Sequence, residues 1–259
     1  MKFYNIASGS KGNATFISTD NTLILIDAGI SYRELVKRSN AVGIDLNRLD
    51  AVLITHEHSD HIQGLKTLSN ELEVPIYMNP ASYKALSEKV GSILHVQEEE
   101  FIHHLFIKDL EISACRHMHD AAYTQGFLVS DGKKSIGLAT DLGKVTPAIF
   151  DKMKQTDFLY IESNYDEQSL INGPYPKFLK YRISGKNGHL SNVDSASTIR
   201  DLIKEGKERF MLAHLSETNN TEQLAKDTLL KVIGEIGACE KDIDLHIAKQ
   251  HVPSEVIEV

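Results

Sequence analysis

Three histidines and one aspartate are concentrated in the segment 56–61, which reads His-Glu-His-Ser-Asp-His. Because side chains two residues apart lie on the same side of an extended chain, His56 and His58 can face one point. Asp60 and His61 turn with the start of the helix that follows, so they can face a neighbouring point. Imidazole nitrogen and carboxylate oxygen are ligands that zinc, manganese and iron accept. The segment therefore predicts two half-built metal sites, because packing alone does not explain four clustered polar groups beside a buried strand.

Other candidate ligands also lie at the ends of apolar runs. His119, Asp141 and His214 each come at the end of a run that indicates a strand. His117 lies two residues before His119 and points the same way along an extended chain, so it is the alternative donor at that position. Asp141 and Asp27 precede glycine-containing turns and by themselves are typical of turn or helix-cap residues.

The elements that must position these side chains are short strands, separated by turns and a few helices. Apolar runs bounded by turn residues predict the strands, and helical spacing with a capping residue or an initial proline predicts the helices. Two runs of strands, each followed by helices, suggest a pseudo-duplicated layout. The predicted strands are 2–7, 14–19, 23–26, 51–54, 74–78, 101–107, 110–114, 127–130, 135–139, 158–161, 209–213, 244–249 and 254–258, the predicted helices are 31–42, 80–90, 193–205 and 221–236, and 98–100 is predicted to be a solvated turn.

Size and composition indicate one globular domain. The chain has 259 residues, of which 41% are hydrophobic and 25% charged, as is ordinary for a single core. Only Cys115 and Cys239 are present, no apolar run reaches the length of a bilayer, and the first residues do not read as a signal peptide. We therefore expect a cytoplasmic protein without disulfides. The net charge of −8 argues against holding nucleic acid by an overall field, although a basic strip or metal ions can supply local attraction.

The spacing His-x-His-x-Asp-His in segment 56–61 resembles the signature of the metallo-β-lactamase superfamily. The resemblance implies an α/β fold, a four-layer αββα sandwich of two mixed sheets, as a single domain over residues 1–259. It implies two divalent metal ions as cofactors, zinc or manganese with iron as a further option, and an aspartate at position 27 that braces the ligand loop. Carried over by position, the first metal would bind His56, His58 and His119, the second would bind Asp60, His61 and His214, and Asp141 would bridge them.

Within the superfamily the chain resembles the YycJ/WalJ-like branch of DNA exonucleases and shares motifs with ribonuclease Z. By the order of those motifs, His189 would protonate the leaving oxygen, Glu162 would orient and charge-support His189, and Asp60 would join them in the catalytic set. One departure is Ile161, which stands where ribonuclease Z has a histidine. The matching segments run over nearly the whole chain and are 7–13, 27–29, 55–61, 119–121, 140–143, 162–166, 173–176, 188–192 and 214–217.

A substrate-binding arm is predicted around residues 163–190. Between 172 and 188 the chain has four basic residues, two prolines and three aromatics, without an acidic residue. This composition suits phosphate contacts combined with base stacking, although an ordinary surface arm with solvated lysines explains it almost as well. The expected substrate contacts are Lys180, Arg182, Asn13 and Ser191.

Together these features favour a dinuclear-metal-dependent phosphodiesterase that cuts DNA from a 5′ end, with RNA as a further substrate. A hydroxide held between the metals would attack the phosphodiester. The alternatives are a small-molecule metallohydrolase, such as a cyclic-nucleotide phosphodiesterase or a glyoxalase II-like thioesterase, and a metal-holding redox or binding protein without hydrolysis. A nucleic-acid substrate is the partner that the sequence indicates, with neither membrane association nor an obligatory protein partner expected.

Overall fold

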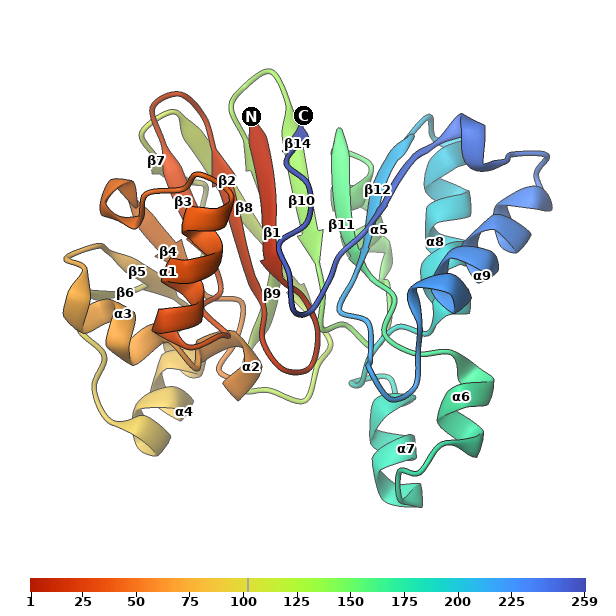
Figure 1. Cartoon of the computed structure of the whole chain (residues 1–259), viewed down its shortest axis with the longest axis horizontal. Coiled ribbons are helices and arrows are strands. Elements are labelled where there is room, and N and C mark those ends of the chain that lie inside the picture. The colour runs from red at the N-terminus through yellow and green to blue at the C-terminus, as the bar shows by residue number, and fades with distance from the viewer. Residues whose placement is uncertain (102) are drawn as a thin grey trace.

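Two mixed β-sheets lie face to face in the computed structural model, which describes residues 1–101 and 103–259 (Figure 1). In the described part of the chain each sheet has seven strands. The first sheet has the order β14 (Ile257–Glu258), β1 (Lys2–Ala7), β2 (Ala14–Ser18), β3 (Leu23–Ile26), β4 (Ala51–Leu53), β5 (Ile76–Met78) and β6 (Val96–Glu98). The second has the order β13 (Asp244–Ile247), β12 (Arg209–Ala213), β11 (Phe158–Glu162), β10 (Ser135–Ala139), β9 (Thr124–Ser130), β8 (Leu110–His117) and β7 (Leu105–Ile107).

Central strands are apolar on both faces because each sheet is covered on both sides. In β11, Phe158 and Tyr160 belong to the core between the sheets, whereas Leu159 and Ile161 belong to the core under the helices. The same alternation divides β3, where Ile24 faces the opposite sheet. A strand covered on both faces reads as a continuous hydrophobic run, which is why runs such as 23–26 and 158–161 were recognisable in the sequence.

Helices form the two outer layers. The first sheet is covered by α1 (Tyr32–Ala41), α3 (Leu65–Glu71) and α4 (Pro80–Val90), and the second by α5 (Pro147–Met153), α8 (Asn192–Lys204) and α9 (Glu222–Gly234) (Figure 1). The arrangement is the predicted four-layer αββα sandwich. Three further helices are α2 (Ser59–Ile62), α6 (Glu167–Asn172) and α7 (Lys177–Ile183), of which α6 and α7 lie at the lower end of the molecule in Figure 1.

Some elements differ from the sequence prediction. Glu98 belongs to β6 and not to a turn over 98–100, because residues 96–98 pair in parallel with β5 as an edge strand. The strand β8 continues to His117, beyond the predicted end at residue 114, because its pairing with β9 continues to His117 opposite Thr124. The predicted strand 101–107 includes residue 102, which lies outside the described residues, and β7 covers its last part. The helices α5, α6 and α7 were not predicted.

No helix within residues 1–101 and 103–259 combines the length and the apolar character needed to cross a bilayer.

Candidate metal centre

The candidate site residues gather where strands of both sheets end at one edge of the sandwich. The strands β3 and β4 run parallel, as do β10, β11 and β12, so the carboxyl ends within each sheet point the same way. Polar residues placed at these strand ends or shortly after them meet across the two sheets. They are Asp27 after β3, segment 56–61 after β4, His119 after β8, Asp141 after β10, Glu162 at the end of β11 and His214 after β12.

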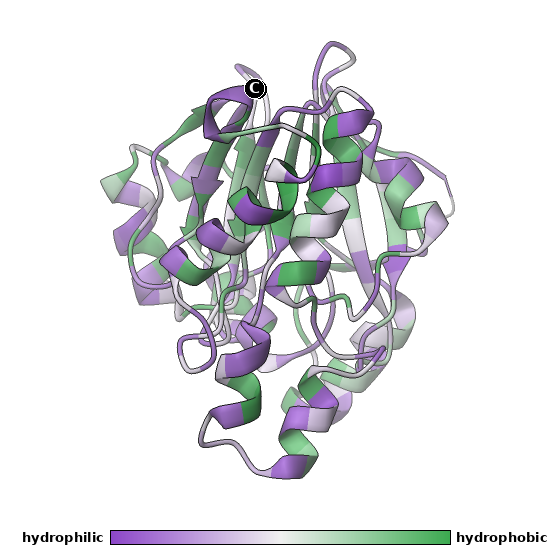
Figure 2. Cartoon of the chain, turned by 90° about the vertical axis from the view of Figure 1, so that its right-hand side faces the viewer, coloured by the Kyte–Doolittle hydropathy of each residue, from purple (hydrophilic) through white to green (hydrophobic). Residues whose placement is uncertain are grey.

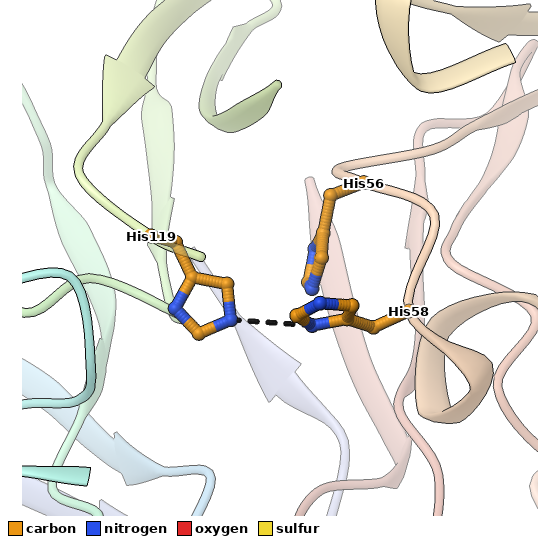
Figure 3. Close-up of side chains that lie close together, drawn as sticks. All are labelled: His56, His58 and His119. Atoms are coloured by element: carbon orange, nitrogen blue, oxygen red, sulfur yellow. Dashed lines mark hydrogen bonds between the residues drawn. The ribbon is translucent and has the colours of Figure 1, made fainter. Parts of the chain in front are cut away.

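The first donor group consists of His56, His58 and His119. One ring nitrogen from each lies within 4.8 Å of the others. Figure 3 shows His56 and His58 extending from one loop while His119 faces them from another segment, with Nε2 of His119 and Nδ1 of His58 3.3 Å apart. The two neighbouring histidines share one side of an extended chain, as their spacing predicts.

The second donor group consists of Asp60, His61 and His214. Oδ2 of Asp60 lies 3.6 Å from Nε2 of His61 and 3.6 Å from Nε2 of His214. The first turn of α2, which carries Asp60, is pressed against the backbone of Gly29, where a Cβ atom would come within 1.7 Å of the Asp60 carbonyl oxygen. Only glycine at position 29 therefore permits α2 to lie where it does.

Asp141 lies between the two donor groups. Its Oδ2 lies 3.2 Å from Nε2 of His61, and its Oδ1 lies 3.7 Å from Nε2 of His119. The carboxylate therefore has one oxygen directed at a histidine of each group. This is the arrangement that a carboxylate shared by two cations requires.

Four histidines of the centre use Nδ1 for a partner within the protein and direct Nε2 inward. In three of the four pairs the partner is a carboxylate or carbonyl oxygen, which can only accept, so Nδ1 carries a hydrogen there and Nε2 is the nitrogen left for a metal. Metal-ligating histidines are commonly held in this way. The pairs are His56 with Thr55 Oγ1 at 3.0 Å, His61 with Asp27 Oδ2 at 2.7 Å, His119 with the Gly188 carbonyl at 3.0 Å and His214 with Glu162 Oε1 at 2.7 Å.

Buried polar atoms without hydrogen-bond partners test whether these residues fit a metal. Among the described residues, such atoms include Nε2 of His56, Nε2 of His214 and Oδ2 of Asp141. An unpartnered carboxylate oxygen and two unpartnered imidazole nitrogens in one buried spot are costly for a protein alone. Divalent cations would satisfy all three, so the donor set fits divalent metal binding.

The protonation states of the centre are set by burial and by mutual contact. Burial, assisted by the nearby His61 imidazole, lowers the pKa of His56 well below its usual value, so this ligand is neutral. Burial would raise the pKa of Asp141, but the imidazoles of His214 and His61 outweigh it and hold that pKa well below the usual range. Burial likewise opposes a proton on His214, yet the Asp141 carboxylate and its neighbours raise the pKa to about 10. The buried carboxylates thus demand positive charge, from protons or from metal ions.

Three of the six described non-glycine residues with positive φ lie in the centre. Asp27, Asp141 and His214 have φ values of 60°, 55° and 53°, in the left-handed region that residues other than glycine rarely adopt. Asp27 and His214 directly follow a strand and Asp141 comes one residue later, and the sharp turn directs each side chain into the centre. Strain of this kind persists where the surrounding structure holds it and is typical of functional sites.

Glu162 connects the metal centre to His189. Its fully buried Oε1 lies 2.8 Å from Nδ1 of His189 and 2.7 Å from Nδ1 of His214, and its Oε2 accepts from the backbone of Leu142 and Leu190. Burial opposes its charge, but the His189 imidazole lowers its pKa to about 2. Burial also opposes a proton on His189, and the Glu162 carboxylate outweighs this and raises that pKa. The sequence prediction paired Glu162 with His189, whereas its contact with His214 was not foreseen.

His117, the alternative to His119, is directed elsewhere. It lies inside β8 with Nδ1 3.0 Å from the Thr140 carbonyl, and its ring covers Gly126, where a Cβ atom would come within 2.6 Å of Nε2. Burial lowers its pKa to about 4. In the part of the chain that the structure describes, His117 belongs to none of the donor groups.

The expected substrate contacts have varied surroundings. Ser191 is buried and caps α8 by accepting from Asp194 N, so it has no exposed surface to offer. Asn13 is buried against Asp60 and His61. Lys180 Nζ donates to the carbonyls of Ile171 and Gly173, each at 2.7 Å, and Arg182 pairs with Asp120.

Sequence reasoning missed three residues that support the centre. The Thr55 hydroxyl donates to Asp27 Oδ2 at 2.9 Å and lies between the rings of His56 and His61. Glu57 accepts from the Ala122 backbone at 2.7 Å and so joins the two loops of the first donor group. The Ser8 hydroxyl accepts from His214 N at 2.8 Å. All three lie inside the matched segments 7–13 and 55–61 or beside them, but nothing in their residue types distinguishes these roles.

The comparisons with known proteins agree with this geometry. A family model described as "Beta-lactamase superfamily domain" matches residues 22–215. Exodeoxyribonuclease YycJ of Bacillus anthracis is 30% identical over 261 residues, covering 99% of this chain and 98% of that protein. Exodeoxyribonuclease WalJ of Streptococcus pneumoniae is 32% identical over 244 residues, covering 91% of this chain and 89% of that protein.

Solved structures of the same superfamily name have a similar fold. The metallo-beta-lactamase fold protein YhfI from Bacillus subtilis superposes with a TM-score of 0.71 at 15% identity, covering 98% of this chain and all of that one (100%). The fold prediction made from the sequence is thereby confirmed.

Proposed function

This chain belongs to the beta-lactamase superfamily, and from that membership and the donor geometry we propose that it is a two-metal phosphodiesterase that degrades DNA from the 5′ end. The observation that carries the proposal is the joining of two donor groups by Asp141 in a chain that resembles exodeoxyribonucleases over nearly its whole length. The substrate partner is therefore a nucleic acid, with DNA favoured over RNA. The whole of residues 1–259 forms one metallo-β-lactamase-fold domain in this proposal.

Seven side chains would hold the metals. The first donor group would hold one cation and the second donor group the other, and Asp141 would be shared by both sites. The donor set of imidazoles and carboxylates suits zinc or manganese, with iron as a further option. Two such cations supply Lewis acidity and a deprotonated water near neutral pH. The chain's own residues provide the neutral imidazoles, the shared carboxylate and the dry surroundings.

His189 would donate a proton to the oxygen that leaves phosphorus. Its Nδ1 is engaged by Glu162, so Nε2 is the atom that reaches substrate. Glu162 raises the pKa of His189 and so favours the protonated imidazole, which can give up its proton as the alkoxide forms. Glu162 therefore acts as a positioning residue for the proton donor and for His214 together.

A digest of end-labelled DNA tests the proposal. Single-stranded DNA labelled at the 5′ or the 3′ end is incubated with the protein and manganese, zinc or a chelator. We expect early release of the 5′ label, progressive shortening of the 3′-labelled strand, and loss of both on chelation. RNA of the same sequence, a cyclic nucleotide, bis-p-nitrophenyl phosphate and a glutathione thioester are assayed in parallel. If the thioester or the cyclic nucleotide is hydrolysed while the DNA stays intact, the proposal is contradicted. Early release of the 3′ label contradicts the proposed 5′-to-3′ direction.

Asp27→Asn is expected to weaken metal binding at the second donor group, which contains His61, by about 10- to 100-fold. The substitution removes the negative charge that His61 Nδ1 contacts at 2.7 Å, which makes the imidazole a poorer ligand. Asparagine tolerates the left-handed conformation of residue 27, so the fold is expected to remain stable. Competition with a chromophoric chelator measures the affinity. Unchanged affinity for both metals would show that Asp27 only shapes the turn.

A further inference from the structure

Two aromatic side chains project from the arm (residues 163–190) into solvent. Phe178 and Tyr181 on α7 are 74% and 76% exposed, and α7 has no buried residue in the described structure. Residues three apart on a helix share a face, so the two rings lie next to each other. Figure 2 shows the helices of the arm extending below the body with hydrophobic as well as hydrophilic segments. Large exposed apolar side chains grouped on one face indicate a binding surface.

The charge around this face fits a polyanion. No acidic residue occurs between Glu167 and Asp194, whereas four basic residues do, in a chain whose net charge is −8. Two of the four are engaged: Lys180 holds the carbonyls of Ile171 and Gly173, and Arg182 is paired with Asp120. Lys177 and Lys186 remain exposed. The arm is thus the locally basic part of an acidic protein, and its most exposed large hydrophobic side chains are aromatic.

The arm is fastened to the metal centre at two places. Arg182 binds the carboxylate of Asp120, whose Oδ1 lies 3.4 Å from Nε2 of His119. Further along the arm, the Gly188 carbonyl accepts from Nδ1 of His119 at 3.0 Å. These contacts place α7, the helix that carries Phe178 and Tyr181, beside the loop that carries His119. A strand whose phosphate lies at the metals is therefore within reach of α7.

The cavity behind Tyr181 suits a neutral base better than a phosphate. It has a volume of about 500 Å³ and lies between α6, α7 and the start of α8, with Ile171 and Tyr181 among its lining residues. Glu167 and Asp194 also line it, so a phosphate there would face two carboxylates. A nucleobase carries no charge, stacks on aromatic rings, and has amino groups that can donate to carboxylates.

We propose that Phe178 and Tyr181 form a stacking platform for the unpaired bases of a DNA single strand next to the metal centre. The inference rests on the proposed function and names its substrate class. In a duplex the faces of the bases are covered by their neighbours, so only an unpaired end can use the platform. Lys177 and Lys186 contact the backbone of the same strand, while Lys180 and Arg182 hold the arm in place.

Binding of natural and abasic strands tests the stacking platform. Phosphorothioate-linked single strands of equal length, with and without bases, are titrated into the metal-loaded protein, so that binding is measured without cleavage. The wild-type protein is expected to bind the natural strand about tenfold or more tightly than the abasic strand, which has the same charge. Phe178→Ala and Tyr181→Ala each lose most of that difference. Phe106→Ala removes an equally large ring, 67% exposed on β7 at the opposite end of Figure 1, and keeps the difference.

A fluorescence measurement keeps the inference testable if an alanine variant is unstable. The chain has no tryptophan, so Phe178→Trp introduces a single reporter, and Phe106→Trp is its control. Stacking is expected to quench the reporter at position 178 with the natural strand and not with the abasic one. Equal binding of both strands by the wild-type protein, or quenching by neither, overturns the platform, even if DNA is cleaved. A base-dependent difference in a protein that cleaves no DNA would overturn the proposed function and leave the platform standing. Equal affinity for a duplex of the same sequence would also overturn the platform.

Discussion

Asp141→Ala is expected to lower DNA cleavage by about 1,000-fold and to leave at most one tightly bound metal per chain. The carboxylate has one oxygen 3.2 Å from a ring nitrogen of His61 and the other 3.7 Å from a ring nitrogen of His119, so both donor groups lose a ligand at once. Without that charge, two cations held close together repel each other with less compensation. The residue lies in a buried spot where water cannot easily replace it.

Elemental analysis and thermal melting measure this effect without relying on activity. A ligand that binds only the folded protein raises its melting temperature, so the wild-type protein should gain stability when metal is added. Asp141→Ala should lose most of that gain, and Asp141→Asn, which keeps the shape but not the charge, should also lose much of it. Asp201→Ala, an exposed carboxylate on α8 that pairs with Arg200, is the control and should retain both metals. Two tightly bound metals in Asp141→Ala would refute the bridging role.

His189→Ala is expected to lower DNA cleavage by about 100- to 10,000-fold while metal content stays near normal. The departing oxygen of DNA is a poor leaving group and needs a proton, which the imidazole held by Glu162 supplies. The p-nitrophenolate anion of bis-p-nitrophenyl phosphate leaves without a proton. Its release should therefore fall by less than about tenfold in the same variant. The measurement is the ratio of the two rates.

His246→Ala is the matched control, because its side chain is 30% exposed compared with 20% for His189, and it lies on β13 away from the donor groups. It should leave both rates unchanged. Glu162→Gln should reduce the DNA rate and weaken metal binding together, since one oxygen of Glu162 contacts both His189 and His214. Equal losses on both substrates in His189→Ala, or loss of metal with unchanged turnover, would contradict the role of proton donor.

Much of the fold was predictable because its strands are covered on both faces or alternate strictly. Runs such as 23–26 and 158–161 carry their own signal, and the predicted strands there agree with β3 and with all but the last residue of β11. The helices α6 and α7 were missed because they are only six and seven residues long and bury little, so no apolar periodicity marks them. The edge strand β6 was missed because it has only three residues, valine, glutamine and glutamate, and forms through its pairing with β5.

The sequence by itself determined the local part of the centre. The i, i+2 and i+4, i+5 spacing within segment 56–61 places its donors through backbone geometry alone, and the strands that carry it are specified by their own apolar residues. Only the tertiary structure decided which distant residues join them. Pairing of β8 with β9 buries His117 against Gly126 and leaves His119 beyond the strand end, facing His58. The tertiary structure also decided that Glu162 contacts both His189 and His214. In the arm, it decided that Lys180 and Arg182 make contacts within the protein while Phe178 and Tyr181 stay exposed. The reason is that spacing along a chain fixes direction only within an element, whereas contacts between elements depend on how the sheets and loops pack.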